Sequence, residues 1–177
     1  GKNWSQTAFS VATRNVTGIK SPTMVAVGKG GKILSRDCDL IIADDIEDFG
    51  STAQPSGRAA TKRWWTTTLS SRVEAHTSVV VIGSRQHSDD LYNSLLENNA
   101  WETIVEQAHS DDCEIPETDF DEHKDCMLWE GKRDYKWLNT QKESSATTGG
   151  VHVFEMVYLN RANPKGASIF SPEAITK

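Results

Sequence analysis

Two short apolar runs constrain the fold of this chain more than any other feature of its sequence. Residues 39–48 read Asp-Leu-Ile-Ile-Ala-Asp-Asp-Ile-Glu-Asp, and residues 79–91 read Val-Val-Val-Ile-Gly-Ser-Arg-Gln-His-Ser-Asp-Asp-Leu. Short runs rich in isoleucine and valine are typical of buried strands in a parallel sheet. Such sheets bind ligands at the carboxyl ends of their strands, where acids and a Ser-Arg pair follow in this chain. The pattern predicts an α/β fold with a functional site at that edge.

The rest of the sequence predicts strands that alternate with helices, which favours a largely parallel sheet. Residues 23–27 and 32–36 are predicted to form a β-hairpin, and residues 101–108 a further strand. Helices are predicted over residues 56–74, from about Ser88 with its hydroxyl as the cap, over 135–144 and over 151–159. An acidic loop is predicted over 109–125 and a break over 146–150.

Composition sets limits on the kind of protein. The 177 residues suffice for one sizeable core, and a net charge of −6 argues against the whole chain coating DNA, so any DNA contact must be local. Three cysteines without paired spacing suggest a reducing compartment rather than a disulfide scaffold. Since no apolar run reaches membrane-spanning length, we expect a cytosolic protein with no membrane partner.

Together the two motifs resemble the ATPase domain of the large terminase subunit, the DNA-packaging motor of tailed bacteriophages and related viruses. The first is similar to its Walker B strand, with Asp-Asp in place of Asp-Glu. The second is similar to its coupling motif GTRWHPDDL, here GSRQHSDDL. Residues 150–160 resemble the segment that leads toward the terminase nuclease.

The resemblance implies a P-loop NTPase-type (ASCE) fold, with a largely parallel sheet and flanking helices. Residues 1–145 would form the C-terminal part of the ATPase domain, and residues 146–177 a linker toward an absent nuclease domain. The sequence has no G-x-x-x-x-G-K-[ST] phosphate loop, because residues 28–32 (Gly-Lys-Gly-Gly-Lys) lack its spacing and its hydroxyl residue. Terminases carry that loop upstream of Walker B. We therefore expect a fragment truncated at its N-terminal side and inactive alone.

The strand ends supply the candidate catalytic residues. Phosphoryl transfer needs a divalent metal, a group that positions water, and positive charge for the transition state. Asp44 is predicted to hold Mg²⁺ through a bound water, and Asp45 to orient or deprotonate the water that attacks ATP. The alternative is that both acids only begin a turn after a buried strand.

Ser84 and Arg85 follow a glycine that permits a tight turn at the second strand end. The Ser84 hydroxyl is placed to contact the γ-phosphate or the attacking water. Arg85 either contacts phosphate or pairs with Asp89 or Asp90, and the structural pairing is favoured. His87 is predicted to be a hydrogen-bonded loop residue rather than a general base.

Arg36 is the candidate arginine finger that would act on a neighbouring subunit's ATP, because the resemblance places such a residue shortly before Walker B. A solvated charge at the edge of a hairpin is the alternative. Arg72 is a weaker candidate for the same role.

The implied activity is ATP hydrolysis with Mg²⁺ that drives double-stranded DNA into a procapsid. The implied partners are DNA, the portal protein, the small terminase subunit and further copies of the chain in a ring, in host cytoplasm and transiently docked on the procapsid. A helicase-like nucleic-acid ATPase and a non-catalytic assembly module with a structural acid pair are the alternatives. A doubly wound regulator that accepts phosphate on Asp44 or Asp45 is a third alternative. The sequence offers no well-placed lysine on a later strand to support it.

Two further groups of residues are interpreted as structural. His109, Cys113, His123 and Cys126 are zinc-type ligands with intervening spacings of three, nine and two residues. Zinc sites usually show tighter pairs, so we expect a flexible acidic loop and no stoichiometric zinc. The tryptophans at positions 64, 65, 101, 129 and 137 lack a basic stripe throughout, which favours packing over base stacking.

Overall fold

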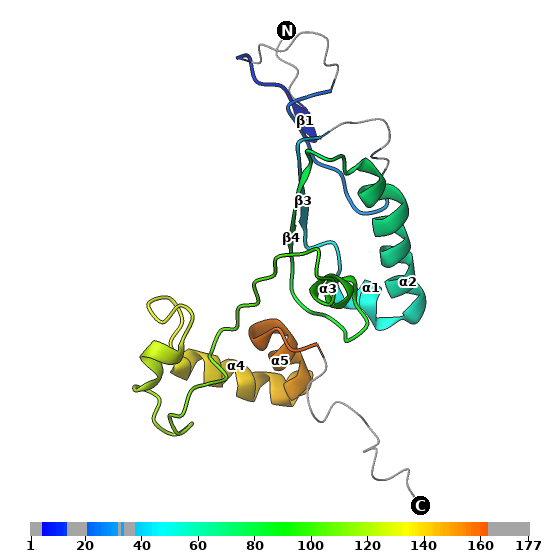
Figure 1. Ribbon diagram of the computed structural model, residues 1–177. Helices are drawn as coiled ribbons and strands as arrows, with labels where there is room; N and C mark the ends of the chain where they lie inside the picture. The colour runs from blue at the N-terminus through cyan, green and yellow to red at the C-terminus, as the bar shows by residue number, and fades with distance from the viewer. Residues whose placement is uncertain (1–4, 14–20, 32, 34–37, 163–177) are drawn as a thin grey trace, which may run out of the picture. The chain divides into compact units, whose positions relative to one another are not determined.

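The computed structural model describes residues 5–13, 21–31, 33 and 38–162, and shows a mixed α/β protein (Figure 1). The chain divides into two compact units, which are described separately here. Unit 1 comprises Gly1–Ile46 and Pro55–Ile82, and unit 2 comprises Glu47–Gln54 and Gly83–Lys177. The predicted domain boundary after residue 145 falls inside a helix of unit 2 and stays a prediction.

The two predicted strands pair with each other in unit 1. Strand β3 (Leu40–Asp44) pairs in parallel with β4 (Ser78–Ile82), with a register that runs from Leu40 opposite Ser78 to Asp44 opposite Ile82. Both runs are rich in β-branched residues, which pack well on a pleated surface, and the sequence therefore predicted these two strands. The two carboxyl ends lie side by side, as the sequence predicted.

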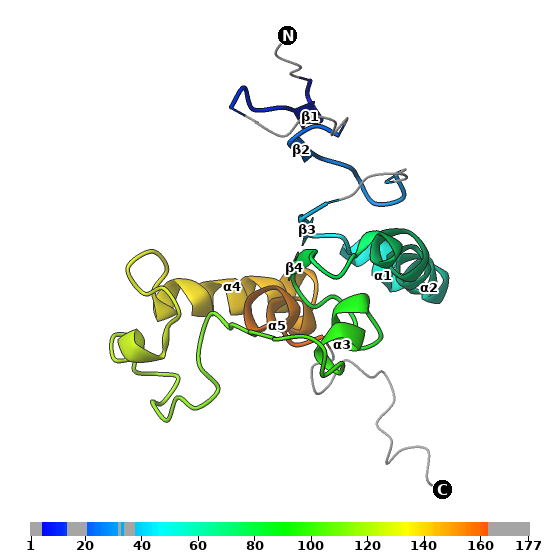
Figure 2. The same cartoon turned by 45° about the horizontal axis from the view of Figure 1, so that its top comes forward.

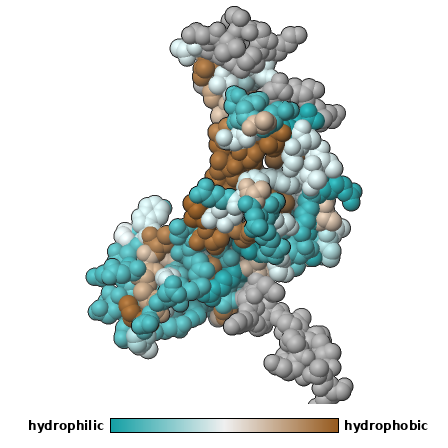
Figure 3. Space-filling view, in the orientation of Figure 1, coloured by the Kyte–Doolittle hydropathy of each residue, from teal (hydrophilic) through white to brown (hydrophobic). Residues whose placement is uncertain are grey.

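The strands are not buried on both faces, contrary to the prediction. Leu40, Ile42, Val80 and Ile82 are 43–57% exposed, whereas Ala43 on the opposite face is 3% exposed. Figure 3 shows the exposed side chains as a hydrophobic area over β3 and β4. Within the described residues this sheet has two strands, which is fewer than the larger sheet that the resemblance implies.

A second, antiparallel pair joins β1 (Ala8–Phe9) to β2 (Met24–Val25). The predicted hairpin partner of β2, residues 32–36, lies outside the described residues apart from position 33. A turn does follow β2, because Gly31 N donates to Gly28 O at 2.9 Å. Gly30 adopts a φ of 83°, which favours glycine at this point of the turn.

The helix predicted over residues 56–74 is present as one path with three geometries. Helix α2 (Pro55–Trp64) passes into a π-helical segment, η1 (Trp65–Leu69), and then a 3₁₀ turn, η2 (Ser70–Arg72). Proline at the first position lacks only an N–H that a helix start leaves unpaired. Trp65 and Leu69, four positions apart, are both buried.

The first helices of unit 2 are short and capped by aspartates. Helix α1 (Phe49–Ala53) begins with a capping box between Asp48 and Ser51, and α3 (Leu91–Leu96) begins with Asp90 as its N-cap. The prediction that Ser88 caps this helix is wrong, because the Asp90 carboxylate accepts from Asn93 N at 2.7 Å. A carboxylate is the stronger acceptor for these N–H groups.

Helices α4 (Tyr135–Thr148) and α5 (Val151–Leu159) lie side by side and hold the core of unit 2 (Figures 1 and 2). Tyr135, Leu138 and Phe154 form this core, and Met127 and Trp137 pack against it. The predicted break at residues 146–150 is shorter than expected, because α4 continues to Thr148 and the chain turns at Gly150, with φ 88°.

Residues 101–108 are not a strand, contrary to the prediction. Among the described residues, no strand lies beside this segment; instead, Ala108 N donates to Tyr158 O at 2.8 Å, and Ala108 O accepts from Leu128 N at 3.1 Å. The predicted acidic loop does follow. It contains one 3₁₀ turn, η3 (His123–Cys126), and an isolated bridge between His109 and Met127 near its ends.

The tryptophans divide between packing and exposure. Trp65 is buried and Trp137 packs on the core of unit 2, which confirms the predicted packing for these two. Trp129 is 65% exposed, with Lys132 Nζ 4.5 Å from the centre of its ring. Among the described residues, no helix has the length and apolar character needed to cross a membrane.

Candidate functional site

The carboxyl end of β3 presents two adjacent acids. Asp44 and Asp45 are both exposed, and Asp45 N donates to Ile82 O at 3.0 Å, which extends the β3–β4 pairing by one bond. Asp45 has a φ of 44°, a left-handed conformation that is uncommon for residues other than glycine. The chain therefore turns sharply at the acid pair. Exposed carboxylates at a strand end can hold a hydrated Mg²⁺ ion.

The loop after β4 is organised by one buried carboxylate. Asp90 is 0% exposed, and its Oδ2 atom accepts from Arg85 Nε at 3.3 Å, from Gln86 N at 2.9 Å and from His87 N at 3.1 Å. Because its Oδ1 atom caps α3, one side chain fixes both the loop and the helix that follows.

Arg85 has the structural role that the sequence analysis favoured, with Asp90 as its partner. Its guanidinium also donates to Asn93 Oδ1 at 2.9 Å, and its backbone N donates to Asn160 Oδ1 at 3.2 Å. Asn160 Nδ2 donates in turn to Glu106 O at 2.9 Å. The loop is thereby attached to α3 and to the end of α5.

Glu47 is a site residue that the sequence analysis missed. It is 3% exposed, and its Oε2 atom accepts from Leu91 N, the first residue of α3, at 2.6 Å. An acceptor here satisfies a backbone N–H that the helix cannot pair within itself. The available signal was an acid three residues after Asp44, but its partner is 44 positions away.

The other predicted site residues have different outcomes. His87 Nδ1 accepts from Asp89 N at 2.9 Å, which confirms a hydrogen-bonded loop residue. Ser84 is half-buried at the start of the loop, and its role as a phosphate sensor stays a prediction. Arg36 lies outside the described residues. Asp44 and Asp45 belong to unit 1, whereas Ser84 and Arg85 belong to unit 2.

Gly83 allows the loop to pass close to α3. A Cβ atom at this position would overlap the Tyr92 ring, which is itself buried. We expect Gly83→Ala to lower the free energy of unfolding by about 1–3 kcal/mol, the range for overpacking a well-packed site. Gly131→Ala is the matched control, since no atom lies within 4 Å of its added Cβ. Equal urea midpoints for the two variants would contradict the close contact with Tyr92.

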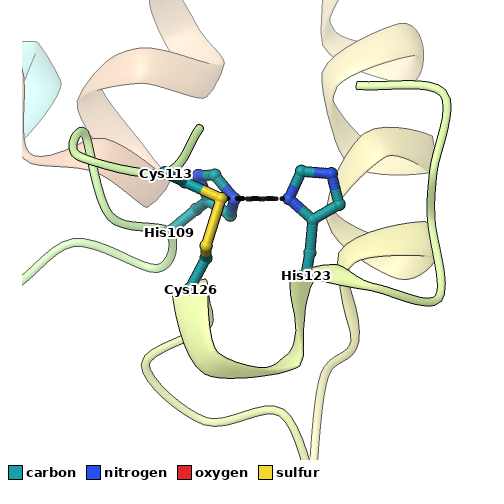
Figure 4. A group of neighbouring side chains, drawn as sticks. All are labelled: His109, Cys113, His123 and Cys126. Atoms are coloured by element: carbon teal, nitrogen blue, oxygen red, sulfur yellow. Dashed lines mark hydrogen bonds between the residues drawn. A yellow bond between two sulfur atoms is a disulfide. The ribbon is translucent and has the colours of Figure 1, made fainter. Parts of the chain in front are cut away.

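A second cluster lies in the acidic loop of unit 2. His109, Cys113, His123 and Cys126 place their ligand atoms within 4.8 Å of one another. Figure 4 shows the four side chains converging, with Cys113 and Cys126 joined in a disulfide. The structure thus contradicts the expectation of unpaired cysteines in a flexible loop, because the chain folds back and brings residues 13 positions apart together.

The imidazoles of this cluster are held in defined orientations. His123 is 1% exposed, and its ring stacks on Tyr135 with 3.6 Å between ring centres. Its Nε2 atom lies 3.1 Å from Pro116 O, and its Nδ1 atom lies 2.9 Å from His109 Nε2. A carbonyl oxygen only accepts, so Nε2 of His123 carries the proton and Nδ1 presents its lone pair to the cluster.

A cavity of about 260 Å³ lies against the cluster, lined by the loop and by α4 and α5. Burial lowers the pKa of His109, and the neighbouring His123 lowers it further. Lys142, whose Nζ lies 2.9 Å from Glu117 Oε1, lowers the pKa of Glu117 through a hydrogen bond and through its charge. The cavity wall therefore combines imidazole rings with the ion pair between Lys142 and Glu117.

Comparison with models of known protein families and with curated protein sequences finds no match to this chain. The structure shows a mixed α/β protein with two groups of polar side chains: the acids at the end of β3, and the histidine and cysteine cluster in the acidic loop.

Proposed function

We propose that this chain is part of the ATP-hydrolysing motor of a viral large terminase, with a P-loop NTPase-type fold. The observation that carries the proposal is the end of β3, where Asp44 and Asp45 follow a strand paired in parallel with β4. In phosphate-transferring enzymes of this class, carboxylates at such a strand end serve the metal and the attacking water. The left-handed turn at Asp45 supports a functional role, because uncommon backbone conformations gather at active sites.

The roles follow from the chemistry of phosphoryl transfer. Asp44 holds Mg²⁺ through water, and Asp45 orients the attacking water, with a shorter reach than glutamate would have. Ser84 senses the γ-phosphate, and Arg36 acts on the ATP of a neighbouring subunit. Arg85 is engaged by Asp90 and Asn93, so its role is to keep the coupling loop rigid.

The exposed face of β3 and β4 is also in keeping with this proposal. Parallel sheets are covered on both faces in α/β proteins. Leu40, Ile42, Val80 and Ile82 offer apolar surface that other parts of a P-loop domain would bury. Burying such side chains contributes about 25 cal/mol per Å² of apolar area, so covering this face would stabilise the unit.

The partners of the proposed motor are double-stranded DNA, the portal protein, the small terminase subunit and other copies of the chain in a ring, with transient docking on the procapsid in host cytoplasm. A helicase-like ATPase is the second candidate, because the same strand-end acids serve both classes. Portal-bearing procapsids that stimulate turnover favour the terminase, whereas stimulation by single-stranded nucleic acid alone favours the helicase.

The proposal predicts that these 177 residues alone do not hydrolyse ATP. Most of the grip on nucleotide in this class comes from the phosphate loop, which the sequence lacks. We expect a Kd for Mg·ATP no tighter than about 1 mM by calorimetry, and no phosphate release above background. An extended chain that includes an upstream phosphate loop is expected to show both binding and turnover.

The control for this experiment is the same extended chain with alanine in place of its phosphate-loop lysine, which should behave like the 177 residues alone. Micromolar ATP binding or steady turnover by the 177 residues would contradict the proposal. The proposal would also be contradicted by an extended chain that binds ATP and whose turnover does not change when Asp44 and Asp45 are substituted.

A further inference from the structure

The cluster of His109, Cys113, His123 and Cys126 has no part in the proposed ATPase chemistry, and its geometry points to a metal. We propose that, with the two cysteines reduced, these four residues bind one Zn²⁺ ion tetrahedrally. Two thiolates with two imidazoles form a donor set typical of structural zinc. This inference is independent of the nucleotide site.

The positions of the ligand atoms suit this ion. Zinc bound at about 2.0–2.1 Å to nitrogen and about 2.3 Å to sulfur holds its tetrahedral ligand atoms about 3.3–3.8 Å apart. In the structure, His123 Nδ1 lies 2.9 Å from His109 Nε2 and 3.4 Å from Cys113 Sγ. These two pairs need only a small adjustment, and all four ligand atoms lie within 4.8 Å of one another. The two sulfur atoms separate to about 3.8 Å once their bond is reduced.

The surroundings of His123 favour metal binding over a hydrogen bond between two neutral rings. A histidine ligand usually donates its other ring N–H to a carbonyl or carboxylate, which fixes the tautomer. The Nε2 atom of His123 has such a partner in Pro116 O, at 3.1 Å. Stacking on Tyr135 fixes the ring plane, so the Nδ1 lone pair is aimed at the other three ligands before any ion binds.

The spacing of the ligands also fits once they are grouped by position. His109 and Cys113 form one close pair, and His123 and Cys126 form the other. Ser110 N donates to Cys126 O at 2.8 Å, which brings the two pairs together across the loop. The spacings taken one after another predict no zinc site, whereas the fold shows two short pairs that meet.

An ion at this position would connect the loop to the core of unit 2. The loop is acidic and supplies few apolar side chains, so it cannot fold around a core of its own. His123 lies against Tyr135 of α4, and the cavity of about 260 Å³ reaches His109, Cys113 and His123. The ion therefore has both an entry path and a structural role.

Zinc can bind to the two cysteines only after their disulfide has been reduced. A dithiol passes two electrons and two protons to the Cys113–Cys126 disulfide, which yields two thiols and an oxidised, disulfide form of the dithiol. Zinc then displaces one proton from each thiol into the buffer. The neutral imidazoles bind through their lone pairs and release none.

Metal analysis of the full 177-residue chain tests this proposal. The chain is reduced with a dithiol, exchanged into oxygen-free buffer with one equivalent of zinc, desalted and analysed by mass spectrometry for metal. We expect one zinc per chain. Cobalt in place of zinc is expected to give the visible absorption of a tetrahedral site and a near-ultraviolet band from thiolate ligands.

Histidine variants separate zinc from a purely structural disulfide, since a disulfide needs no imidazole. Loss of an outer-shell partner weakens metal sites about 10–100-fold, so His123→Gln and His109→Gln, which remove a ligand, are expected to weaken zinc binding by at least about 100-fold. His109 is only half-buried, so its variant tests the idea even where His123→Gln fails to fold.

The matched controls are His76→Gln and Cys38→Ser, which lie in unit 1 and should keep one zinc. A reduced, folded chain that retains no zinc would overturn the proposal. Zinc retained in full by both histidine variants would overturn it as well.

Discussion

Under the proposed function, Asp45→Asn is expected to lower ATP turnover by the intact subunit about 10²–10⁴-fold, the contribution typical of a general base. In this proposal the substitution removes a charge that acts on the attacking water in the transition state, while the proposed upstream phosphate loop keeps its hold on ground-state ATP. We therefore expect kcat to fall and the Kd for ATP to change little. Single-turnover phosphate release and calorimetry on the same sample measure the two effects separately.

The control for this prediction is Asp39→Asn, the same chemical change just before the first residue of β3. Asp39 precedes Leu40, so it lies at the other end of the strand from the acid pair. Its carboxylate is fully exposed and lies 3.7 Å from His76 Nε2. Its turnover should equal that of the unchanged protein. Normal turnover in Asp45→Asn would show that the acid pair only shapes the turn.

Asp90→Ala is expected to have the largest effect on stability. The substitution removes the acceptor for Arg85 Nε and for three backbone N–H groups, and leaves the Arg85 guanidinium, whose side chain is 17% exposed, without its charge partner. Removing one partner of a buried ion pair costs about 3–5 kcal/mol. Chemical denaturation followed by circular dichroism measures the loss.

Asp89→Ala is the matched control, because it makes the same change one residue earlier on an exposed side chain. Surface substitutions usually change stability by less than about 0.5 kcal/mol. Similar denaturation midpoints for the two variants would refute the view that Asp90 organises the loop.

The sequence predicted what short-range patterns control. The β-branched runs identified β3 and β4, and their parallel pairing put both carboxyl ends at one edge. Leu159 was correctly predicted as the end of the last helix, because the apolar run stops there and Asn160 adopts the left-handed conformation with φ 52°. Local acids also indicated the Arg85–Asp90 pair, since the two residues are five positions apart.

The sequence did not predict what depends on contacts between distant segments. Glu47 looked like one more acid after Asp44 and Asp45, and only the fold shows that it meets Leu91. The zinc-type ligands were separated by acidic residues, and only the folding back of the loop brings Cys126 beside Cys113. The prediction of a strand over residues 101–108 was wrong, because alternation of apolar and polar residues does not by itself provide a neighbouring strand to pair with.

The division of the chain into units has a consequence for how the molecule can be dissected. The polypeptide leaves unit 1 after Ile46, contributes α1 to unit 2, returns at Pro55 and leaves again after Ile82. No single proteolytic cut or truncation therefore releases either unit whole. During synthesis, Glu47 emerges from the ribosome well before Leu91, 44 residues later, so the buried contact between them is completed only after both strands of the parallel pair have been made.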